Sequence, residues 1–290
     1  MTGRRVVGHV AAVLLVLSGC GGEPAASTSA APLSRSTPAA AYDPSLPPAR
    51  AVLALVPHAA ATLRVTDFDQ VRAQYGAEPG DATFWKQATA HAPLLSTDML
   101  RGYAGRLRGF TPDDVSWEAR YAGDGPGATG WVLGFGPDTD MAAVQRAVAD
   151  GIGPLKGTVV DTAARLVTSQ AVPDTDPRWL DLADLVGPEA EATYVARGCL
   201  PGDTRGERLQ PLDAYAIGFG QNLATAYLGP DREDLFLRMR LGGSVPAFSA
   251  ALTHGAADPR TGRIGYEITD PVDAAQLALR GELPFAVCAD

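Results

Sequence analysis

The chain has 290 residues, of which 46% are hydrophobic and 20% are charged, so it is long and apolar enough for one or two globular domains with a buried core. Its 33 acidic residues outnumber its 24 lysines and arginines, which gives a net charge of -9 and an isoelectric point near 4.9. This acidic balance argues against a protein that is drawn by charge to nucleic acid or to anionic lipid.

The first twenty residues have the pattern of an export signal. Arg4 and Arg5 precede an apolar run, residues 6–17, which is shorter than the roughly 20 helical residues that span a hydrocarbon core. The sequence Leu-Ser-Gly-Cys, ending at Cys20, resembles the lipobox of bacterial lipoproteins. That resemblance implies that residues 1–19 are removed and that the Cys20 thiol carries diacylglycerol, on the extracytoplasmic face of the cell membrane. The alternative is a secretory peptide cleaved at a nearby alanine, with Cys20 incidental.

A linker separates this signal from the rest of the chain. Residues 20–49 are mostly Gly, Ala, Ser, Thr and Pro, and such a segment buries too little apolar surface to offset the entropy of ordering. We expect a lipidated, disordered tether with a reach of about 30 Å. The globular body then covers residues 50–290.

The composition also indicates the kind of genome. Only Lys86 and Lys156 are lysines, so nearly all the positive charge is arginine, and alanine is abundant. This bias is typical of high-GC genomes and is not by itself a sign of arginine chemistry. The whole chain resembles the lipoproteins of high-GC Gram-positive bacteria. That resemblance supports the lipid anchor and an oxidised cysteine pair, and it implies no particular activity.

Two cysteines remain once Cys20 is assigned to lipid. Cys199 and Cys288 form an even pair in an exported chain, which predicts a disulfide bond. Such a bond would close a loop of about 90 residues and, in the chain-entropy description, stabilise the fold by roughly 4 to 5 kcal/mol. Two buried free thiols are the alternative. A redox centre is not indicated, because neither cysteine lies in a C-x-x-C pair.

A short pattern recurs four times along the body. Each copy has an apolar strand, a turn with Asp, Thr, Gly or Pro, and a helical stretch that ends at Gly. The copies are residues 63–76, 131–151, 224–242 and 263–281. Asp or Thr at the start of a helix accepts free backbone N–H groups, and Gly after its end adopts the left-handed conformation, so the pattern predicts four strand–helix units.

A second similarity suggests a duplication. Residues 53–65 and 182–196 both carry a Leu-Ala-rich segment, a Pro and then an apolar strand. Residues 115–121 alternate apolar and polar side chains, as half-buried antiparallel strands do. We therefore predict an α+β fold, with antiparallel sheets and helices packed on one face, in two similar halves at about 50–187 and 188–290.

Two glycine-containing strands share a pattern of faces. Residues 131–136 and 215–220 each place aromatic and aliphatic side chains on one face and glycines on the other. The aromatic face is expected to be core. The glycine face would admit a closely packed helix or a ligand.

No group of residues predicts a catalytic, cofactor-binding or metal site. The mature chain has His58, His91 and His254, the last of which we expect at a helix end, and it has no G-x-S-x-G elbow. Zinc-ligand spacings and a phosphate-binding P-loop are also missing from the sequence. The close acidic pairs fall in turns where helix capping explains them; they are Asp67 and Asp69, Asp138 and Asp140, and Asp174 and Asp176. The last pair lacks the Gly and the terminal Glu of a calcium loop.

Three functional hypotheses follow from these observations. The first is a non-catalytic surface lipoprotein that binds an envelope protein or glycan in a groove between the two halves. The second is an envelope hydrolase that uses carboxylates such as Asp124 or Glu118. The third is a carrier of a small apolar ligand, with a cavity lined by Trp117, Trp131 and Phe135.

Overall fold

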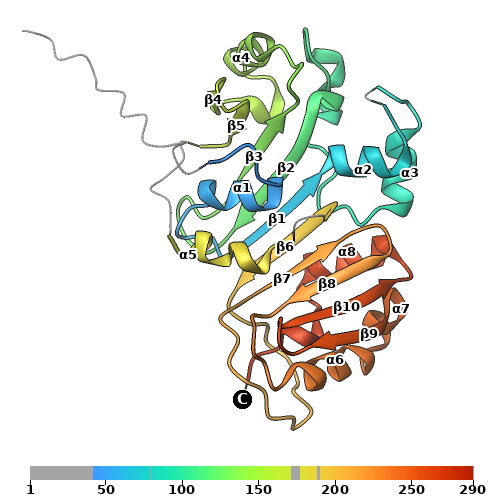
Figure 1. Ribbon diagram of the computed structural model, residues 1–290. Coiled ribbons are helices and arrows are strands. Elements are labelled where there is room, and N and C mark those ends of the chain that lie inside the picture. The colour runs from blue at the N-terminus through green and yellow to red at the C-terminus, as the bar shows by residue number, and fades with distance from the viewer. Residues whose placement is uncertain (1–41, 79, 171–176, 188–189, 290) are drawn as a thin grey trace, which may run out of the picture. The chain divides into compact units, whose positions relative to one another are not determined.

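The computed structural model describes residues 42–290 except 79, 171–176, 188–189 and 290 (Figure 1). The predicted signal peptide, Cys20 and most of the predicted linker lie outside these described residues. Helix α1 (Pro48–Ala51) already packs on the body with Ala49 buried, so the body begins slightly before residue 50. No helix in the described part of the chain has the length and apolar character needed to cross a membrane.

One sheet of ten strands runs through the described body, in the order β4-β5-β3-β2-β1-β6-β7-β8-β10-β9. Each neighbouring pair of these strands is antiparallel. The strands are β1 (Thr62–Asp67), β2 (Val115–Ala122), β3 (Gly130–Phe135), β4 (Val159–Asp161), β5 (Leu166–Thr168), β6 (Ala192–Arg197), β7 (Ala214–Phe219), β8 (Leu223–Tyr227), β9 (Leu252–Asp258) and β10 (Arg263–Ile268). The α+β class with an antiparallel sheet is thus confirmed, and the strands form one continuous sheet.

The sheet has the same strand order in both directions from its centre. At the centre β1 pairs with β6, and Arg64 lies opposite Tyr194. Outward from there, one half runs β1-β2-β3-β5-β4 and the other β6-β7-β8-β10-β9. Helix α4 (Met141–Ala149) follows β3, and helix α6 (Leu235–Gly243) follows β8 at the corresponding place. A short helix also comes before the first strand of each half: α1 before β1, and α5 (Pro177–Leu180) before β6.

The four predicted strand–helix units are present: β1 with α2 (Phe68–Tyr75), β3 with α4, β8 with α6, and β10 with α8 (Pro271–Arg280). In the third unit α6 runs one residue past the expected Gly242, and Ser244 follows it. Asp67, Asp140 and Asp270 begin helices α2, α4 and α8, and each accepts a backbone N–H in the first turn. Gly76 and Gly281 end α2 and α8 in the left-handed conformation. The remaining helices are α3 (Phe84–His91) and α7 (Pro246–Ala251).

Helix α6 begins at a buried ion-pair network rather than at a capping side chain. Asp234 accepts hydrogen bonds from Arg232 and from Arg238, whose side chain is fully buried. Burial alone would raise the pKa of Asp234, but these hydrogen bonds lower it below its usual value. Arg238 also donates to the carbonyls of Phe285 and Val287, so the network attaches α6 to the C-terminal segment.

The predicted disulfide bond is present. Cys199 and Cys288 are joined, with their Cα atoms 4.9 Å apart. Beside the bond, the N–H of Cys288 donates to the carbonyl of Leu200, and the N–H of Leu200 donates to the carbonyl of Ala286. The bond therefore fixes the C-terminal segment to the segment that follows β6.

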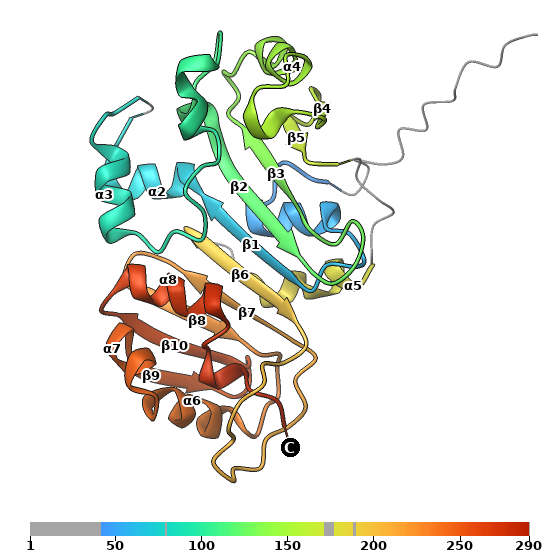
Figure 2. The ribbon, with the colours of Figure 1, turned by 180° about the vertical axis from the view of Figure 1, so that it is seen from behind.

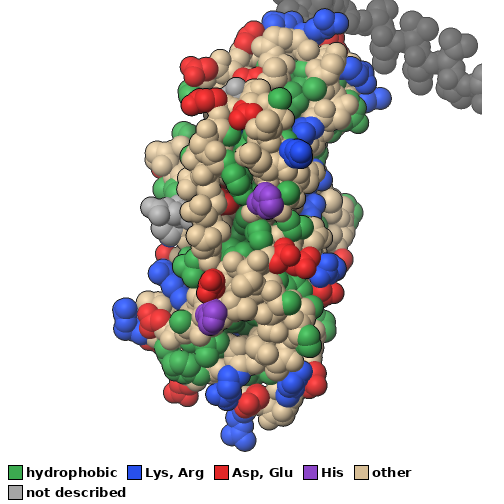
Figure 3. Space-filling view, turned by 90° about the vertical axis from the view of Figure 1, so that its right-hand side faces the viewer, with side chains coloured by type: hydrophobic (Ala, Val, Ile, Leu, Met, Phe, Trp, Pro, Cys, Tyr) green, Lys and Arg blue, Asp and Glu red, His purple; other side chains and the backbone are tan. Residues whose placement is uncertain are grey.

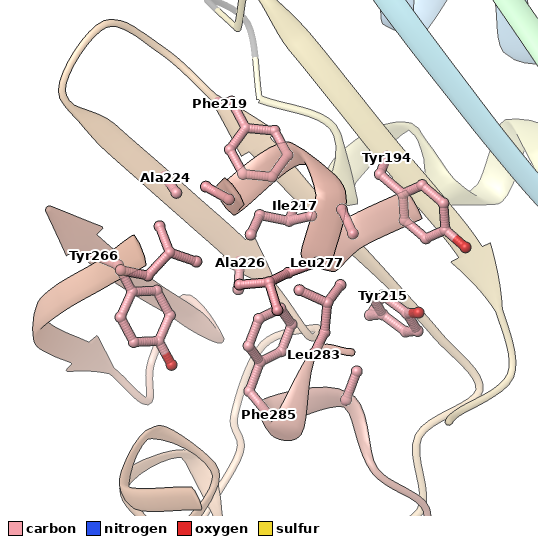
Figure 4. Packing of buried hydrophobic residues seen from close by; sticks show 14 of the residues in the cluster. Tyr194, Tyr215, Ile217, Phe219, Ala224, Ala226, Tyr266, Leu277, Leu283 and Phe285 are labelled. Carbon is pink, nitrogen blue, oxygen red and sulfur yellow. The ribbon is translucent and has the colours of Figure 1, made fainter. Parts of the chain in front are cut away.

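Helices cover both faces of the sheet, so the expectation of helices on one face is wrong. Figure 1 shows α1 and α5 in front of the sheet, and Figure 2 shows α8 on the opposite side. On the first face Val52 and Trp179 pack against Val65 of β1. On the second face α8 packs its alanines and leucines against Ile217 of β7, as Figure 4 shows for Leu277. Apolar side chains lie on both faces of the sheet, in clusters on opposite sides of it, and each cluster packs against helices.

Candidate functional site

The two carboxylates considered for hydrolysis lie in different environments. Glu118 of β2 is fully buried; it accepts a 2.6 Å hydrogen bond from Arg120 Nε and a 2.9 Å hydrogen bond from the Met99 N–H. Asp124 is exposed in the turn between β2 and β3. These positions do not give a solvent-facing pair of carboxylates.

The three aromatic residues considered for an apolar cavity do not all line one space: Trp117 and Phe135 border an open pocket of about 240 Å³, and Trp131 lines a different one. Trp117 and Phe135 are each only 6% exposed and belong to clusters on opposite faces of the sheet. The Trp117 ring lies over Gly134, where a Cβ atom would come within 2.1 Å of it. At Gly134 the glycine face of β3 therefore admits a neighbouring indole, and the open pocket lies beside it, along Gly134 and Gly136. Trp131 is half-buried, and it lies in the groove described below.

The histidines of the described residues do not gather with other ligating groups, and the histidine side chains on the face drawn in Figure 3 lie apart from one another. His91 ends α3 at the surface. His254, expected at a helix end, lies instead in strand β9, with Nδ1 2.7 Å from Glu267 Oε2. Asp174 and Asp176 lie outside the described residues. Over the described ranges, no three His, Cys, Asp or Glu side chains come together as they would around a metal ion.

A row of polar and aromatic side chains crosses the centre of the sheet. In the strand registers Tyr194 of β6 lies opposite Arg64 of β1, Arg64 opposite Arg120 of β2, and Arg120 opposite Trp131 of β3. Side chains at directly opposite positions point to the same face, with Cβ atoms about 5 Å apart. The row therefore presents two guanidinium groups between two aromatic rings.

This row forms the floor of a groove of about 320 Å³, which we call the arginine groove. Its walls come from Thr62, from Thr129 in the β2–β3 turn and from Leu279 of α8. In the second half this row continues from Tyr194 to Ile217 of β7 and Ala226 of β8, and α8 covers these apolar side chains. Figure 2 shows α8 over those strands, while the middle of β1, β2 and β3 has no helix in front of it. The arginine groove thus lies where the two halves meet, beside the end of α8.

The two arginines of the arginine groove are not equally neutralised. Like charges directly opposite each other in a sheet are destabilising. Glu118 neutralises Arg120, whereas the half-buried guanidinium of Arg64 makes no hydrogen bond or ion pair with any described residue. Burial and the positive charge of Arg120 both lower the pKa of Arg64. An unpaired arginine next to a second arginine is a typical place for an anion to bind.

A second acidic side chain lies behind the groove. Asp98 is 4% exposed and has a positive φ of 55°; its Oδ1 accepts the N–H of Leu100. Burial, together with the charge of Glu118, raises the pKa of Asp98 to about 7. The neighbouring residue Met99 donates to Glu118. The segment that carries Asp98 therefore fixes Glu118, which in turn fixes Arg120.

A small cavity of about 50 Å³ lies at the β1–β6 junction, beside α1. Glu191 and Thr193 line it and are almost fully buried, and Glu191 Oε2 and Thr193 Oγ1 lack hydrogen-bond partners among the described residues. Burial raises the pKa of Glu191 to about 7 and that of the half-buried Asp67 to about 6. A cavity of this size holds one or two waters and not an organic ligand.

Sequence reasoning did not select Arg64 or Arg120. Alternation places both on the polar side of their strands, and Glu118 with them. Their meeting depends on the pairing of β1 with β2, across more than fifty intervening residues, and alternation carries no information about that pairing.

Comparisons with protein-family models, with curated proteins and with solved structures found no match. The function of this chain is therefore inferred from its own residues.

Proposed function

We propose that this chain is a lipid-anchored surface protein whose body binds an envelope partner, a glycan or a protein, in the arginine groove. The observation that carries the proposal is the unpaired Arg64 beside Arg120, in an open groove of ligand size where the two halves meet. The proposed role is non-catalytic, because Glu118 is committed to Arg120 and Met99.

The proposed location at the membrane surface rests on the N-terminal sequence pattern and on the disulfide bond. The lipobox resemblance supports a lipid anchor at Cys20, and the Cys199–Cys288 bond is consistent with an oxidising, extracytoplasmic compartment. Cys20→Ala is expected to yield protein without the lipid mass, either unprocessed or released. A lipidated Cys20→Ala protein in the mass spectrum would contradict the anchor.

We also infer that the two halves arose by duplication. The support is the matching strand order from the centre outward, with a helix after the third strand and a short helix before the first strand in each half. Duplication explains why a groove forms where the halves meet. Helix α8 covers one face of the second half, whereas no helix covers the middle of β1, β2 and β3 on the same face (Figure 2).

Co-sedimentation with envelopes isolated from the producing bacterium tests partner binding. The mature chain with Cys20→Ser is used, so that lipid does not itself cause sedimentation. It is expected to co-sediment, and Thr129→Trp, which adds a bulky ring at the exposed groove wall, is expected to reduce the bound fraction at least about fivefold. Gln87→Trp, on exposed α3, is the matched control and should bind as the parent does. Equal binding by both tryptophan variants would show that the arginine groove is not the binding site.

A further inference from the structure

We infer that the ligand of the arginine groove is an acidic glycan, whose carboxylate or phosphate binds Arg64 and Arg120 while a sugar ring packs against Trp131. This inference rests on the proposed function, because it names the partner of that same groove. It goes further in specifying the charge and the shape of the ligand.

The charge of the ligand follows from the arginine pair. Arg64 and Arg120 lie directly opposite each other on β1 and β2. Among the described residues Arg120 forms an ion pair with Glu118, whose charge also acts on Arg64 without an ion pair between them. The Arg120 side chain is 34% exposed, so it reaches solvent even while it is paired with the buried Glu118. A carboxylate or phosphate in the groove would offset the repulsion between the two arginines, and guanidinium groups bind both anions through paired hydrogen bonds.

The other side chains that line the arginine groove indicate that the ligand contains a sugar. Trp131 and Tyr194 stand at the two ends of the row, about 15 Å apart at the roughly 5 Å spacing of opposite positions, so one sugar ring contacts one of them. Tyr194 is only 9% exposed and lies at the edge of the hydrophobic cluster in Figure 4, whereas Trp131 is half-buried. The Trp131 ring can pack against the apolar face of a pyranose, and the hydroxyls of Thr62 and Thr129 both donate and accept hydrogen bonds, as sugar hydroxyls require.

An extended acidic peptide fits this groove less well. Peptides that bind along a sheet usually add a strand to a free edge. Here β6, β1, β2 and β3 are internal strands, each paired on both sides, so their backbones have no free edge to offer. The free edges lie at β4 and β9, at the outer ends of the sheet.

Isothermal titration calorimetry of the full mature Cys20→Ser chain tests the inference with three probes. They are a galacturonic acid tetramer, a galactose tetramer and galactose 6-phosphate. The acidic tetramer is expected to bind at least about tenfold more tightly than the neutral tetramer, and the affinity should fall as NaCl rises from about 50 to 500 mM. Binding of the phosphorylated sugar alone would assign the acidic group as phosphate, and binding of the acidic tetramer alone would assign it as carboxylate.

Arg64→Gln is the decisive variant, because Arg64 makes no hydrogen bond or ion pair within the described part of the chain. It is expected to weaken binding of the acidic probe about tenfold or more and to flatten the salt dependence. Arg106→Gln, on an exposed 3₁₀ turn, makes the same change in net charge away from the groove and should bind as the parent does. Circular dichroism confirms that both variants fold.

The outcomes separate the inference from the proposed function. Equal affinity for acidic and neutral probes, or an unchanged affinity in Arg64→Gln, overturns the inference. The same holds if neither acidic probe binds while the parent chain still co-sediments with envelopes, and in that case the proposed function survives. If the parent chain does not co-sediment with envelopes, the proposed function itself fails.

Discussion

Individual side chains decide which parts of this sheet are filled and which are open. Trp117 occupies the space above Gly134. Arg120 lies three positions further along β2, on the opposite face, and with Arg64 of β1 it lines the arginine groove. On one strand, an indole thus fills the space beside a glycine, and a guanidinium leaves an open groove.

Gly134→Ala is expected to destabilise the fold. The added Cβ would lie 2.1 Å from the Trp117 ring, which is buried and has little room to move, so a cost of about 2 kcal/mol is expected. Gly102→Ala is the matched control, because a Cβ there meets nothing within 4 Å. Urea unfolding should show a lower midpoint for Gly134→Ala and little change for Gly102→Ala. Similar midpoints for the two would mean that the Trp117–Gly134 packing is loose.

Glu191→Gln is expected to change how stability depends on pH. Burial raises the pKa of Glu191 to about 7, so between its unfolded pKa and about 7 the folded state holds a proton that the unfolded state has released. Unfolding free energy therefore falls as pH rises through this window. The glutamine variant should lose this fall and be more stable than the parent at pH 8, by up to about 3 kcal/mol.

Unfolding of the Glu191→Gln protein and its parent at several pH values between 4 and 8 measures this difference. Asp124→Asn is the control, because Asp124 is exposed and its removal should leave the slope unchanged. A parent protein whose stability rises through this window, or a slope that Glu191→Gln does not alter, would contradict the burial of an unpaired carboxylate at Glu191.

At the level of helices and strands, local chemistry sets the boundaries. Asp270 accepts the N–H of Asp273, Pro271 occupies the first helical position and Gly281 ends the helix at a φ of 67°. Each of these effects acts within a few residues, which is why the four strand–helix units could be predicted from the sequence. Asp234 is the informative exception. Its partners Arg232 and Arg238 are close in sequence, but Gln210, which donates to Asp234, and the carbonyls that these arginines bind belong to distant segments.

Asp270→Ala is expected to lower stability by about 1 kcal/mol through loss of the α8 cap. Asp270→Ser should restore most of this loss, because the serine hydroxyl accepts the same N–H. Thermal unfolding of both variants distinguishes capping from a general effect of charge. If serine proves as destabilising as alanine, the hydrogen bond to Asp273 is not the source of the effect.

The arrangement of elements could be predicted only in part. Alternation correctly gave antiparallel strands, and an even cysteine count correctly gave the Cys199–Cys288 bond. Helices on both faces were missed, because the short α1 and α5 segments carry no periodic signal of their own. The pairing of Arg64 with Arg120 was missed as well, because strand order depends on contacts between distant segments.

Over the whole molecule, the second half is closed by its C-terminal segment. The disulfide bond joins residues 89 positions apart, and Arg238 holds the same segment from the side of α6. The disulfide bond and the Arg238 hydrogen bonds both hold the half that carries α8, and α8 supplies Leu279 to the arginine groove. Stability of the second half and shape of the groove are therefore linked.

Replacing both Cys199 and Cys288 with alanine is expected to lower stability by roughly 4 kcal/mol, chiefly because the unfolded chain gains freedom. The variant should still fold at low temperature, since the Arg238 network remains. Scanning calorimetry of the variant and of the parent, the latter with and without a reducing agent, measures the effect. A parent protein whose unfolding temperature is insensitive to reduction would contradict a stabilising bond.

The most direct test of groove binding is site-specific photocrosslinking in the native, membrane-anchored protein. Benzoylphenylalanine is placed at Thr129, at the groove wall, or at Gln87 on α3, and the crosslinked species are identified by mass spectrometry. The account predicts an envelope species captured from Thr129 and not from Gln87, with capture reduced by Arg64→Gln. Capture from Gln87 alone, or from Thr129 with no dependence on Arg64, would contradict it.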